Sequence, residues 1–184
     1  GLSETSPVSC CNTPLITGFT GHIGLPLPGT DVSIRDDEGN QMPSGTPGEI
    51  CIRGPQVMAG YWGSQEETNK VITSDGFLKT GDIGVMDLHG YVKIIDRKKD
   101  VVIVSGFNVY PNEVEEVVAT LPGVFECAVV GVPDEHSGEV VKVYVVKSDV
   151  NLTEDQVRAH CKEQLTNYKR PKYIEFINEL PKNT

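Results

Sequence analysis

The chain has 184 residues, of which 38% are hydrophobic and 23% are charged, a balance typical of folded proteins and unlike that of disordered ones. Its 16 Lys and Arg against 26 Asp and Glu give a formal net charge of −10, which disfavours nucleic-acid binding over the whole surface. The longest apolar runs are too short to cross a bilayer, and five cysteines without a Cys-x-x-Cys pair favour a reducing cytoplasm.

The first half of the chain is predicted to consist of short strands, turns and one helix. Alternating apolar residues predict strands around residues 32–34, 50–52 and 92–96, and residues 64–73 are predicted to form a short helix. We expect a small antiparallel, β-barrel-like subdomain with this helix attached. Tyr61-Trp62, just before the helix, is interpreted as core packing rather than as a stacking platform.

The hydrophobic pattern of the sequence changes after Asp96. The apolar run at residues 101–104 suits a strand that is covered on both faces. A helix is expected to follow at Pro111-Asn112, with Asn112 as its cap. Apolar residues of this helix recur at helical spacing: Val114, Val117, Val118 and Leu121.

Three strands and a second helix complete the second half. Strands are predicted at residues 127–132, 140–146 and 173–177. Before the last strand, a capping box at Thr153 opens a helix that carries Val157, Cys161 and Leu165 on one face. The order β-α-β-β-α-β predicts a compact α+β domain, so the whole chain is expected to have a mixed α+β fold.

The charged side chains place a domain boundary near residues 96–100. Residues 1–96 contain 5 basic and 12 acidic side chains, whereas residues 97–184 contain 11 and 14. The basic run Arg97-Lys98-Lys99 stands at this junction. We therefore expect two domains, residues 1–96 and residues 97–184.

Thr80-Gly81-Asp82 is the first candidate for a binding site. A carboxylate after a glycine turn can accept two hydrogen bonds from a ribose diol. The alternative is an aspartate that caps a turn. No two glycines are separated by a single residue, so the Gly-x-Gly-x-x-Gly phosphate loops have no counterpart here. A nucleotide would have to bind by another route.

Four further polar segments each leave two interpretations open. Asp96-Arg97-Lys98-Lys99-Asp100 is either a solvated charge run or, because an apolar strand follows directly, a site at a junction. Ser105-Gly106-Phe107-Asn108 needs a close backbone approach or a positive φ at Gly106, and a plain β-turn explains it equally well. Asp134-Glu135-His136-Ser137 is more typical of a surface loop than of acid–base chemistry. Residues 168–172 form either a basic patch for a phosphate or a solvated connection.

Five segments, in this order, resemble motifs of the adenylate-forming enzyme superfamily, and within it the bacterial long-chain fatty-acid–CoA ligases. They are Gly1-Leu2-Ser3-Glu4-Thr5, Gly48-Glu49-Ile50 with Gly60-Tyr61-Trp62, Phe77-Leu78-Lys79-Thr80-Gly81-Asp82, residues 95–116, and Pro181-Lys182-Asn183-Thr184. Each motif is weak alone. Five at family-like spacing, over essentially the whole chain, make a strong match.

The resemblance implies a two-step reaction that uses ATP, Mg²⁺ and coenzyme A. A fatty acid and ATP first give an acyl-adenylate and pyrophosphate, and the thiol of coenzyme A then attacks the adenylate to give acyl-CoA and AMP. Carried over position by position, the family's motifs assign Mg²⁺ to Glu4, the phosphate to Thr5, the ribose hydroxyls to Asp82, the ribose and phosphate side to Arg97, the hinge to Lys99, the pantetheine passage to Gly106 and a nucleotide contact to Asn108.

The resemblance also implies which part of such an enzyme the chain represents. Residues 1–96 would be the last, β-rich subdomain of the large N-terminal AMP-binding domain, and residues 97–184 the mobile C-terminal domain. The phosphate loop and most of the acyl pocket are expected before Gly1, and the catalytic lysine beyond Thr184. No catalytic residue is therefore expected within the chain, and the isolated chain is expected to be inactive. Lys182 matches an earlier lysine of the final motif.

Two other functions stay open. A related adenylating enzyme that loads a carrier protein, or that oxidises its adenylate, shares motifs with the ligases, and a non-catalytic interaction module is the other alternative. For the ligase we expect a cytoplasmic enzyme whose partners are fatty acid, ATP and CoA, without nucleic acid. Peripheral association of the full-length enzyme with the inner membrane is left open.

Overall fold

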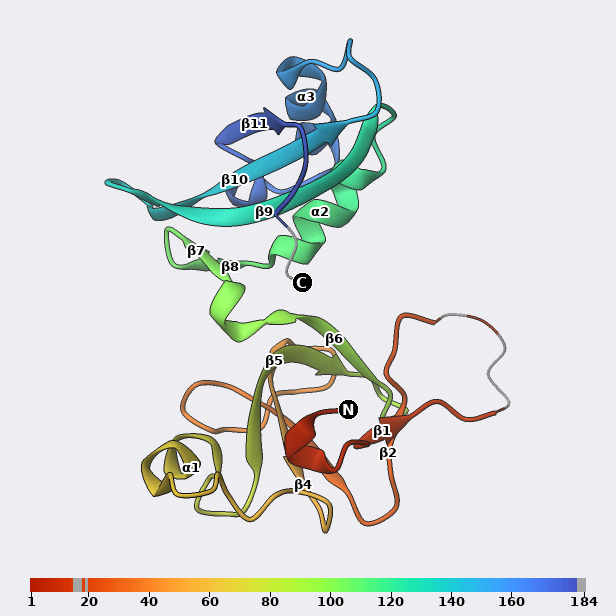
Figure 1. The fold of residues 1–184 in the computed structure, drawn as a ribbon, viewed down its shortest axis with the longest axis vertical. Coiled ribbons are helices and arrows are strands. Elements are labelled where there is room, and N and C mark those ends of the chain that lie inside the picture. The colour runs from red at the N-terminus through yellow and green to blue at the C-terminus, as the bar shows by residue number, and fades with distance from the viewer. Residues whose placement is uncertain (15–17, 19, 182–184) are drawn as a thin grey trace. The chain divides into compact units, whose positions relative to one another are not determined.

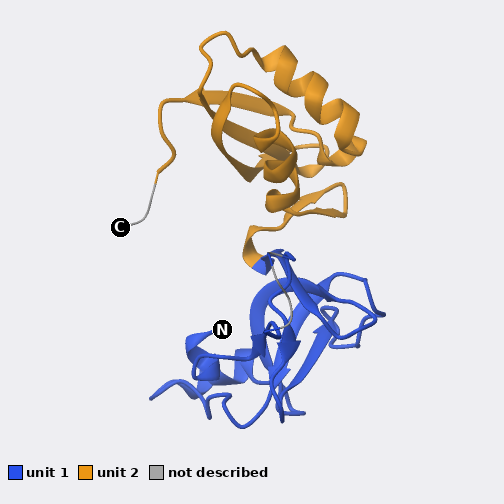
Figure 2. Ribbon diagram, turned by 90° about the vertical axis from the view of Figure 1, so that its right-hand side faces the viewer, with its two compact units in different colours: residues 1–98 blue, residues 99–184 orange. Residues whose placement is uncertain are grey.

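The computed structural model describes residues 1–14, 18 and 20–181. It divides into two compact units, Gly1–Lys98 and Lys99–Thr184, which are described separately (Figure 2). The expected mixed α+β fold is confirmed, because each unit combines strands with at least one helix. Within the described ranges, no helix is long and apolar enough to span a membrane.

Unit 1 is built on a four-stranded antiparallel sheet. Its strands follow one another in the order β3 (Asp31–Arg35), β4 (Gly48–Arg53), β5 (Leu78–Met86) and β6 (Val92–Arg97), of which the last three are labelled in Figure 1. The helix α1 (Gln65–Val71) lies between β4 and β5 in the chain, and a short antiparallel pair, β1 (Cys10–Cys11) and β2 (Leu25–Pro26), precedes the sheet. The core forms around four buried side chains of the sheet: Ile34, Ile50, Ile52 and Val92.

Two expectations for unit 1 need correction. The sheet is open rather than barrel-like, since no pairing closes β3 onto β6 in the described part of the chain. Core packing of Tyr61-Trp62 is wrong, because Trp62 is fully exposed and Tyr61 is 39% exposed. Trp62 lies in a turn next to Gly63, whose φ is +67°, so it belongs to neither the helix nor the sheet.

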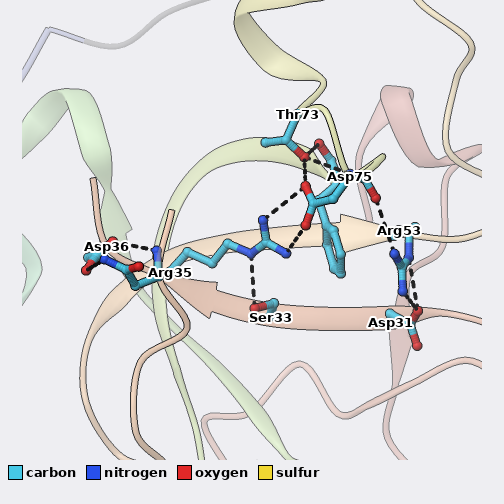
Figure 3. A network of polar contacts seen from close by, with 9 residues as sticks. Asp31, Ser33, Arg35, Asp36, Arg53, Thr73 and Asp75 are labelled. Carbon is cyan, nitrogen blue, oxygen red and sulfur yellow. Dashed lines mark hydrogen bonds and ion pairs between the residues drawn. The ribbon is translucent and has the colours of Figure 1, made fainter. Parts of the chain in front are cut away.

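Ion pairs and one aromatic ring connect β3 and β4 to the turn that precedes β5 (Figure 3). The Arg35 guanidinium donates to both carboxylate oxygens of Asp75, at 3.3 and 2.7 Å, and Thr73 Oγ1 donates to the same carboxylate at 2.6 Å. These contacts hold the pKa of the Asp75 carboxyl well below its usual range. Arg35 and Arg53 both stand over the Phe77 ring, at 4.0 and 4.5 Å from its centroid. The network fixes the turn from which β5 begins.

Unit 2 is a valine-rich sheet with two helices. The chain runs through β7 (Val102–Val104), β8 (Phe107–Val109), α2 (Pro111–Ala119), β9 (Val124–Asp134), β10 (Gly138–Lys147), α3 (Glu154–Gln164) and β11 (Tyr173–Ile177). β10 pairs with β11 in parallel and with β9 and β7 antiparallel. Both helices contribute to the same buried cluster as β10, so they lie on one face of the sheet (Figure 1).

The second helix is confirmed and the start of the first is corrected. Thr153 caps α3 in a capping box with Gln156, and Val157 and Cys161 are buried as expected. In α2, however, Tyr110 rather than Asn112 is the cap, because Pro111 occupies the first helical position, where its fixed φ and missing N–H fit. Asn112 therefore lies inside the first turn.

The run at residues 101–104 is also corrected. Val102 and Val104 are buried, but Ile103 is 52% exposed, so only one face of this strand is covered. The strand is the first half of a hairpin, in which the two turn residues Ser105 and Gly106 have φ of 50° and 83°. Two positive φ values make a turn whose twist matches the flanking strands. Of the alternatives for Gly106, the structure shows a positive φ in a tight turn, and a Cβ added there would meet no atom within 4 Å, so no close approach requires the glycine.

Acid is expected to weaken unit 2 through Asp134. The Lys172 ammonium donates to this carboxylate, as do the amides of His136 and Ser137, and together they lower its pKa to about 2. A lowered pKa in the folded state means that the stabilisation is present above the unfolded value near 4 and is lost as the pH falls through about 2. Asp134→Asn should lower the urea midpoint, measured by circular dichroism, at about pH 6 and make little difference at about pH 2. An equal decrease at both pH values would contradict this role of the charge.

Candidate functional site

Thr80-Gly81-Asp82 forms a bulge in the middle of β5. β4 pairs with β5 as Glu49 with Ile83 and as Cys51 with Lys79, so the three residues 80–82 stand opposite the single residue Ile50. Gly81 has a φ of +74°, a conformation that a glycine adopts without strain. A bulge of this kind redirects the side chains that follow it. The segment is therefore neither the end of a strand nor a simple turn.

The bulge leaves the Asp82 carboxylate without a hydrogen bond from the described residues. Its one ionic partner there is Arg97 on β6, whose Nε lies 3.9 Å from Oδ1. The side chain of Asp82 is 17% exposed, while that of Arg97 is 66% exposed. Burial raises the pKa of the Asp82 carboxyl, and Arg97 opposes this effect. A partly buried acceptor with unused lone pairs can bind a ligand that carries two hydroxyl groups.

Two side chains attach the bulge to β4. Thr80 Oγ1 donates to the Ile50 carbonyl at 2.7 Å and accepts from the Asp82 amide at 3.1 Å. The Gly81 amide donates to Glu49 Oε1 at 3.1 Å, and Lys98 Nζ donates to Glu49 Oε2 at 2.8 Å. Burial lowers the pKa of Lys98, but the hydrogen bonds to Asp37 and Glu49 outweigh burial, so the pKa lies above its usual value.

A hollow of about 360 Å³ lies against the bulge within unit 1. Its lining includes residues of the first turn, of α1 and of β5: Leu2, Glu4, Glu49, Tyr61, Lys70, Val71, Leu78, Lys79, Thr80, Gly81 and Lys98. Glu4 Oε1 accepts a hydrogen bond of 3.1 Å from the Tyr61 hydroxyl, and burial together with the Glu4 carboxylate raises the pKa of that hydroxyl. The hollow thus brings Glu4 and Gly81, predicted from separate motifs, to one place.

Two family patterns match the chain. The AMP-binding enzyme family matches residues 1–62, and the C-terminal domain of AMP-binding enzymes matches residues 113–184. The chain therefore carries AMP-binding enzyme domains over these two stretches.

The proteins that resemble this chain include ligases and synthetases. A long-chain-fatty-acid–CoA ligase of Yersinia pestis is 55% identical over 183 residues, which are all of this chain and 32% of the relative. Structures similar to the whole chain include ATP-bound MatB from Rhodopseudomonas palustris, with a TM-score of 0.94, 40% identity and 37% of its chain covered. The o-succinylbenzoate CoA synthetase MenE of Bacillus subtilis, in complex with an acyl-adenylate, has a TM-score of 0.81 and 34% identity over 89% of this chain and 33% of its own. The chain therefore spans about a third of the length of these relatives.

Glu4 suits the Mg²⁺ that AMP-binding enzymes are expected to use with ATP. The described residues contain no group of three potential metal ligands. Mg²⁺ commonly takes one or two carboxylates and receives its other ligands from phosphates and water, so a single glutamate beside a hollow fits this ion. Thr5, predicted to contact the phosphate, is buried, and its hydroxyl donates to the carbonyls of Leu2 and Pro7 at 3.1 and 3.0 Å. Its phosphate contact stays a prediction.

Three predicted residues lie in unit 2. Lys99 is exposed in the short 3₁₀ helix Lys98–Asp100, Gly106 is in the hairpin turn, and Asn108 is exposed on β8. Their roles as hinge, CoA passage and nucleotide contact stay predictions, as does the last motif, whose residues 182–184 lie outside the described residues.

The basic patch at residues 168–172 is paired with other groups of unit 2. Lys169 contacts Glu113 at 2.6 Å, and Arg170 donates to the carbonyls of Leu165 and Lys162 at the end of α3. Lys172 donates to Asp134. These contacts favour the interpretation of the segment as a connection between α3 and β11 over that of a phosphate patch.

Sequence reasoning missed the roles of Glu49 and Lys98. From the sequence, Glu49 was recognised only as part of a family motif and was assigned no role. Lys98 was recognised only as one of the cations in the charged segment 96–100. Their ion pair joins positions 49 residues apart, so no local pattern contains it. The one usable signal was an acid directly beside the apolar residues of β4, because a carboxylate in a buried strand requires a partner.

Proposed function

We propose that the chain is the part of an ATP-dependent long-chain fatty-acid–CoA ligase that holds the ribose of ATP and carries the C-terminal domain. The observation that carries this proposal is the 55% identity, over the whole chain, to a ligase of that name. The bulge in β5 supports it, because Asp82 has free acceptor sites and directly follows Gly81, which lines the same hollow as Glu4.

The proposed chemistry assigns a role to each part of unit 1. Asp82 accepts hydrogen bonds from the ribose hydroxyls, and Arg97, exposed beside it, contacts the ribose and phosphate side. Glu4 holds Mg²⁺, which neutralises phosphate charge when it is bound with ATP. The fatty-acid carboxylate attacks the α-phosphorus and pyrophosphate leaves. The thiolate of coenzyme A then attacks the acyl carbon, and AMP leaves with the bond electrons. Positioning and charge stabilisation account for most of such catalysis.

The same proposal assigns the two units. Gly1–Lys98 corresponds to the last subdomain of the AMP-binding domain, and Lys99–Thr184 to the mobile C-terminal domain with Lys99 as hinge. Gly106 lies by the pantetheine passage, and Asn108 contacts the nucleotide. The proposed enzyme is cytoplasmic.

The test uses the full-length protein that contains this chain. Purified protein is incubated with ATP, Mg²⁺, CoA and either palmitate or o-succinylbenzoate, and the products are identified by mass spectrometry. We expect palmitoyl-CoA and AMP, both dependent on ATP and Mg²⁺. A heat-inactivated sample is the control for non-enzymatic thioester formation.

Each other outcome replaces the proposal with a defined alternative. Conversion of o-succinylbenzoate alone would make the protein a related ligase for another acid, as the likeness to MenE suggests. An acyl-adenylate without acyl-CoA would point to an enzyme that loads a carrier protein or transforms its adenylate otherwise. No adenylate with either acid would favour a non-catalytic interaction module.

A further inference from the structure

Glu49 is a buried carboxylate with both oxygens engaged. The residue is 6% exposed, and its side chain lies under the bulge of β5. Oε1 accepts from the Gly81 amide at 3.1 Å, and Oε2 accepts from the Lys98 ammonium at 2.8 Å. Burying a carboxylate costs free energy unless it is paired and hydrogen-bonded, and removing one partner of such a pair leaves an uncompensated charge. The charge of Lys98 therefore determines whether Glu49 stays in place.

The backbone amide that Glu49 holds lies directly before Asp82. Gly81 has a positive φ and stands in the part of β5 that faces β4 across the bulge, where regular strand pairing is interrupted. The Asp82 carboxylate has only the contact of 3.9 Å with Arg97 among the described residues. Its direction consequently depends on the backbone of the bulge, which is attached to β4 through Thr80 and through Glu49.

Lys98 also has a second and different partner. Its Nζ lies 2.7 Å from Asp37 Oδ1, but the side chain of Asp37 is 80% exposed, against 7% for Glu49. Water and salt screen an exposed pair far more than a buried one, so the contact with Asp37 is the weaker of the two. Asp37 does not contact the bulge. Its substitution is therefore a suitable control, because it removes an ion pair of Lys98 without removing the one with Glu49.

We infer that Glu49 and Lys98 are positioning residues for ribose recognition: the buried ion pair holds the Gly81 amide and thereby aims the Asp82 carboxylate at the ribose hydroxyls. The inference rests on the proposed function. It adds that Lys98, the last residue of unit 1, takes part in nucleotide selection through Glu49. Lys98 and its neighbour Lys99 thus have separate roles, one in unit 1 and the other as the proposed hinge.

This role is tested by measuring how wild type and variants bind two nucleotides that differ in their ribose hydroxyls. The full-length protein binds ATP or 2′,3′-dideoxyATP, and the ratio of the two dissociation constants measures how much affinity depends on the ribose hydroxyls. We expect wild type to prefer ATP by at least about tenfold, because two hydrogen bonds to a carboxylate are lost in the dideoxy nucleotide. Lys98→Met and Glu49→Gln should reduce this preference to about threefold or less, mainly by weakening ATP binding.

Three further measurements separate positioning from general stability. Lys98→Arg should restore most of the preference, since it keeps the charge, and Asp37→Asn should leave it unchanged. Glu49→Gln keeps the size of the side chain, but it has one acceptor oxygen for two donors, the Gly81 amide and Lys98, so it cannot keep both contacts and remains informative if Lys98→Met unfolds. Thermal unfolding of every variant, without nucleotide, reports its stability independently of ribose recognition.

Three results would overturn the inference in different ways. If the variants bind both nucleotides more weakly while the preference stays as in wild type, the ion pair is merely structural and the proposed function is untouched. If wild-type protein binds neither nucleotide, the proposed function fails and the inference fails with it. A wild type that binds both equally well would remove the ribose role of Asp82 and, with it, the positioning role.

Discussion

Replacing Asp82 with alanine in the full-length protein is expected to raise the ATP concentration needed for half-maximal adenylate formation, or to lower turnover, by at least about tenfold. Hydrogen bonds to a charged acceptor contribute about 1.5–3 kcal/mol each, so two of them, less the compensation from water, amount to about 2–4 kcal/mol. The structure supports this prediction, because no described residue donates a hydrogen bond to the Asp82 carboxylate. Its lone pairs are therefore available to the ribose hydroxyls.

The measurement is pyrophosphate exchange with a saturating fatty acid, over a range of ATP concentrations. Asp31→Asn is a suitable control, since Asp31 is an acid at the far end of the same sheet and pairs only with Arg53 among the described residues. It removes a carboxylate from unit 1 without changing the hollow, and its kinetics should stay close to those of wild type. Kinetics of Asp82→Ala within about twofold of wild type would assign Asp82 a purely structural role in the bulge.

Elements with a strong local pattern were predictable from the sequence. The capping box at Thr153 and the apolar face of Val157 and Cys161 identify α3, since both signals lie within one helix. The last strand, Tyr173–Ile177, was predicted with its observed bounds, and its aromatic and β-branched residues, which favour strands, stand between two polar segments. The candidate Asp82 came from a short glycine-containing motif, and the family resemblance assigned it to ribose.

Features that depend on pairing between distant segments were not predictable. The bulge exists because β4 and β5 pair in two different registers on either side of Ile50, and register is a property of both strands. The exposure of Ile103 likewise follows from the hairpin with β8, which turns one face of the strand outward. The burial of Trp62 was predicted wrongly for a related reason. A large aromatic residue is usually buried, but a turn that contains glycine can place one in solvent.

The connection between the units carries the second large prediction, because the two proposed half-reactions place opposite demands on it. Adenylate formation needs a lysine of the C-terminal domain near the α-phosphate, whereas thioester formation needs that lysine withdrawn and a path opened for the thiol. A single rigid arrangement cannot meet both demands, so the domain is expected to rotate about a short segment. Lys99 suits this role, since it is exposed, lies directly after the anchored Lys98 and precedes β7.

Lys99→Pro is therefore expected to impair one half-reaction far more than the other. Proline fixes φ near −65°, which matches the 3₁₀ helix Lys98–Asp100, and it also restricts the backbone of residue 98 toward extended conformations. The segment then has fewer conformations available, so the C-terminal domain keeps one of its two positions and loses the other. The half-reaction that needs the retained position continues, and the other half-reaction is impaired. Lys99→Ala, which removes the side chain but leaves φ free, should affect both steps only slightly.

The two steps are assayed separately in full-length protein. Pyrophosphate exchange reports adenylate formation, and attack of CoA on supplied acyl-adenylate reports thioester formation. We expect at least about a tenfold difference between the two losses in Lys99→Pro, with circular dichroism and thermal unfolding close to wild type. Equal losses in a folded variant would place the pivot elsewhere, because a restriction at the pivot has to favour one arrangement. Equal losses together with a lower unfolding temperature would mean that position 99 supports the fold instead of the movement.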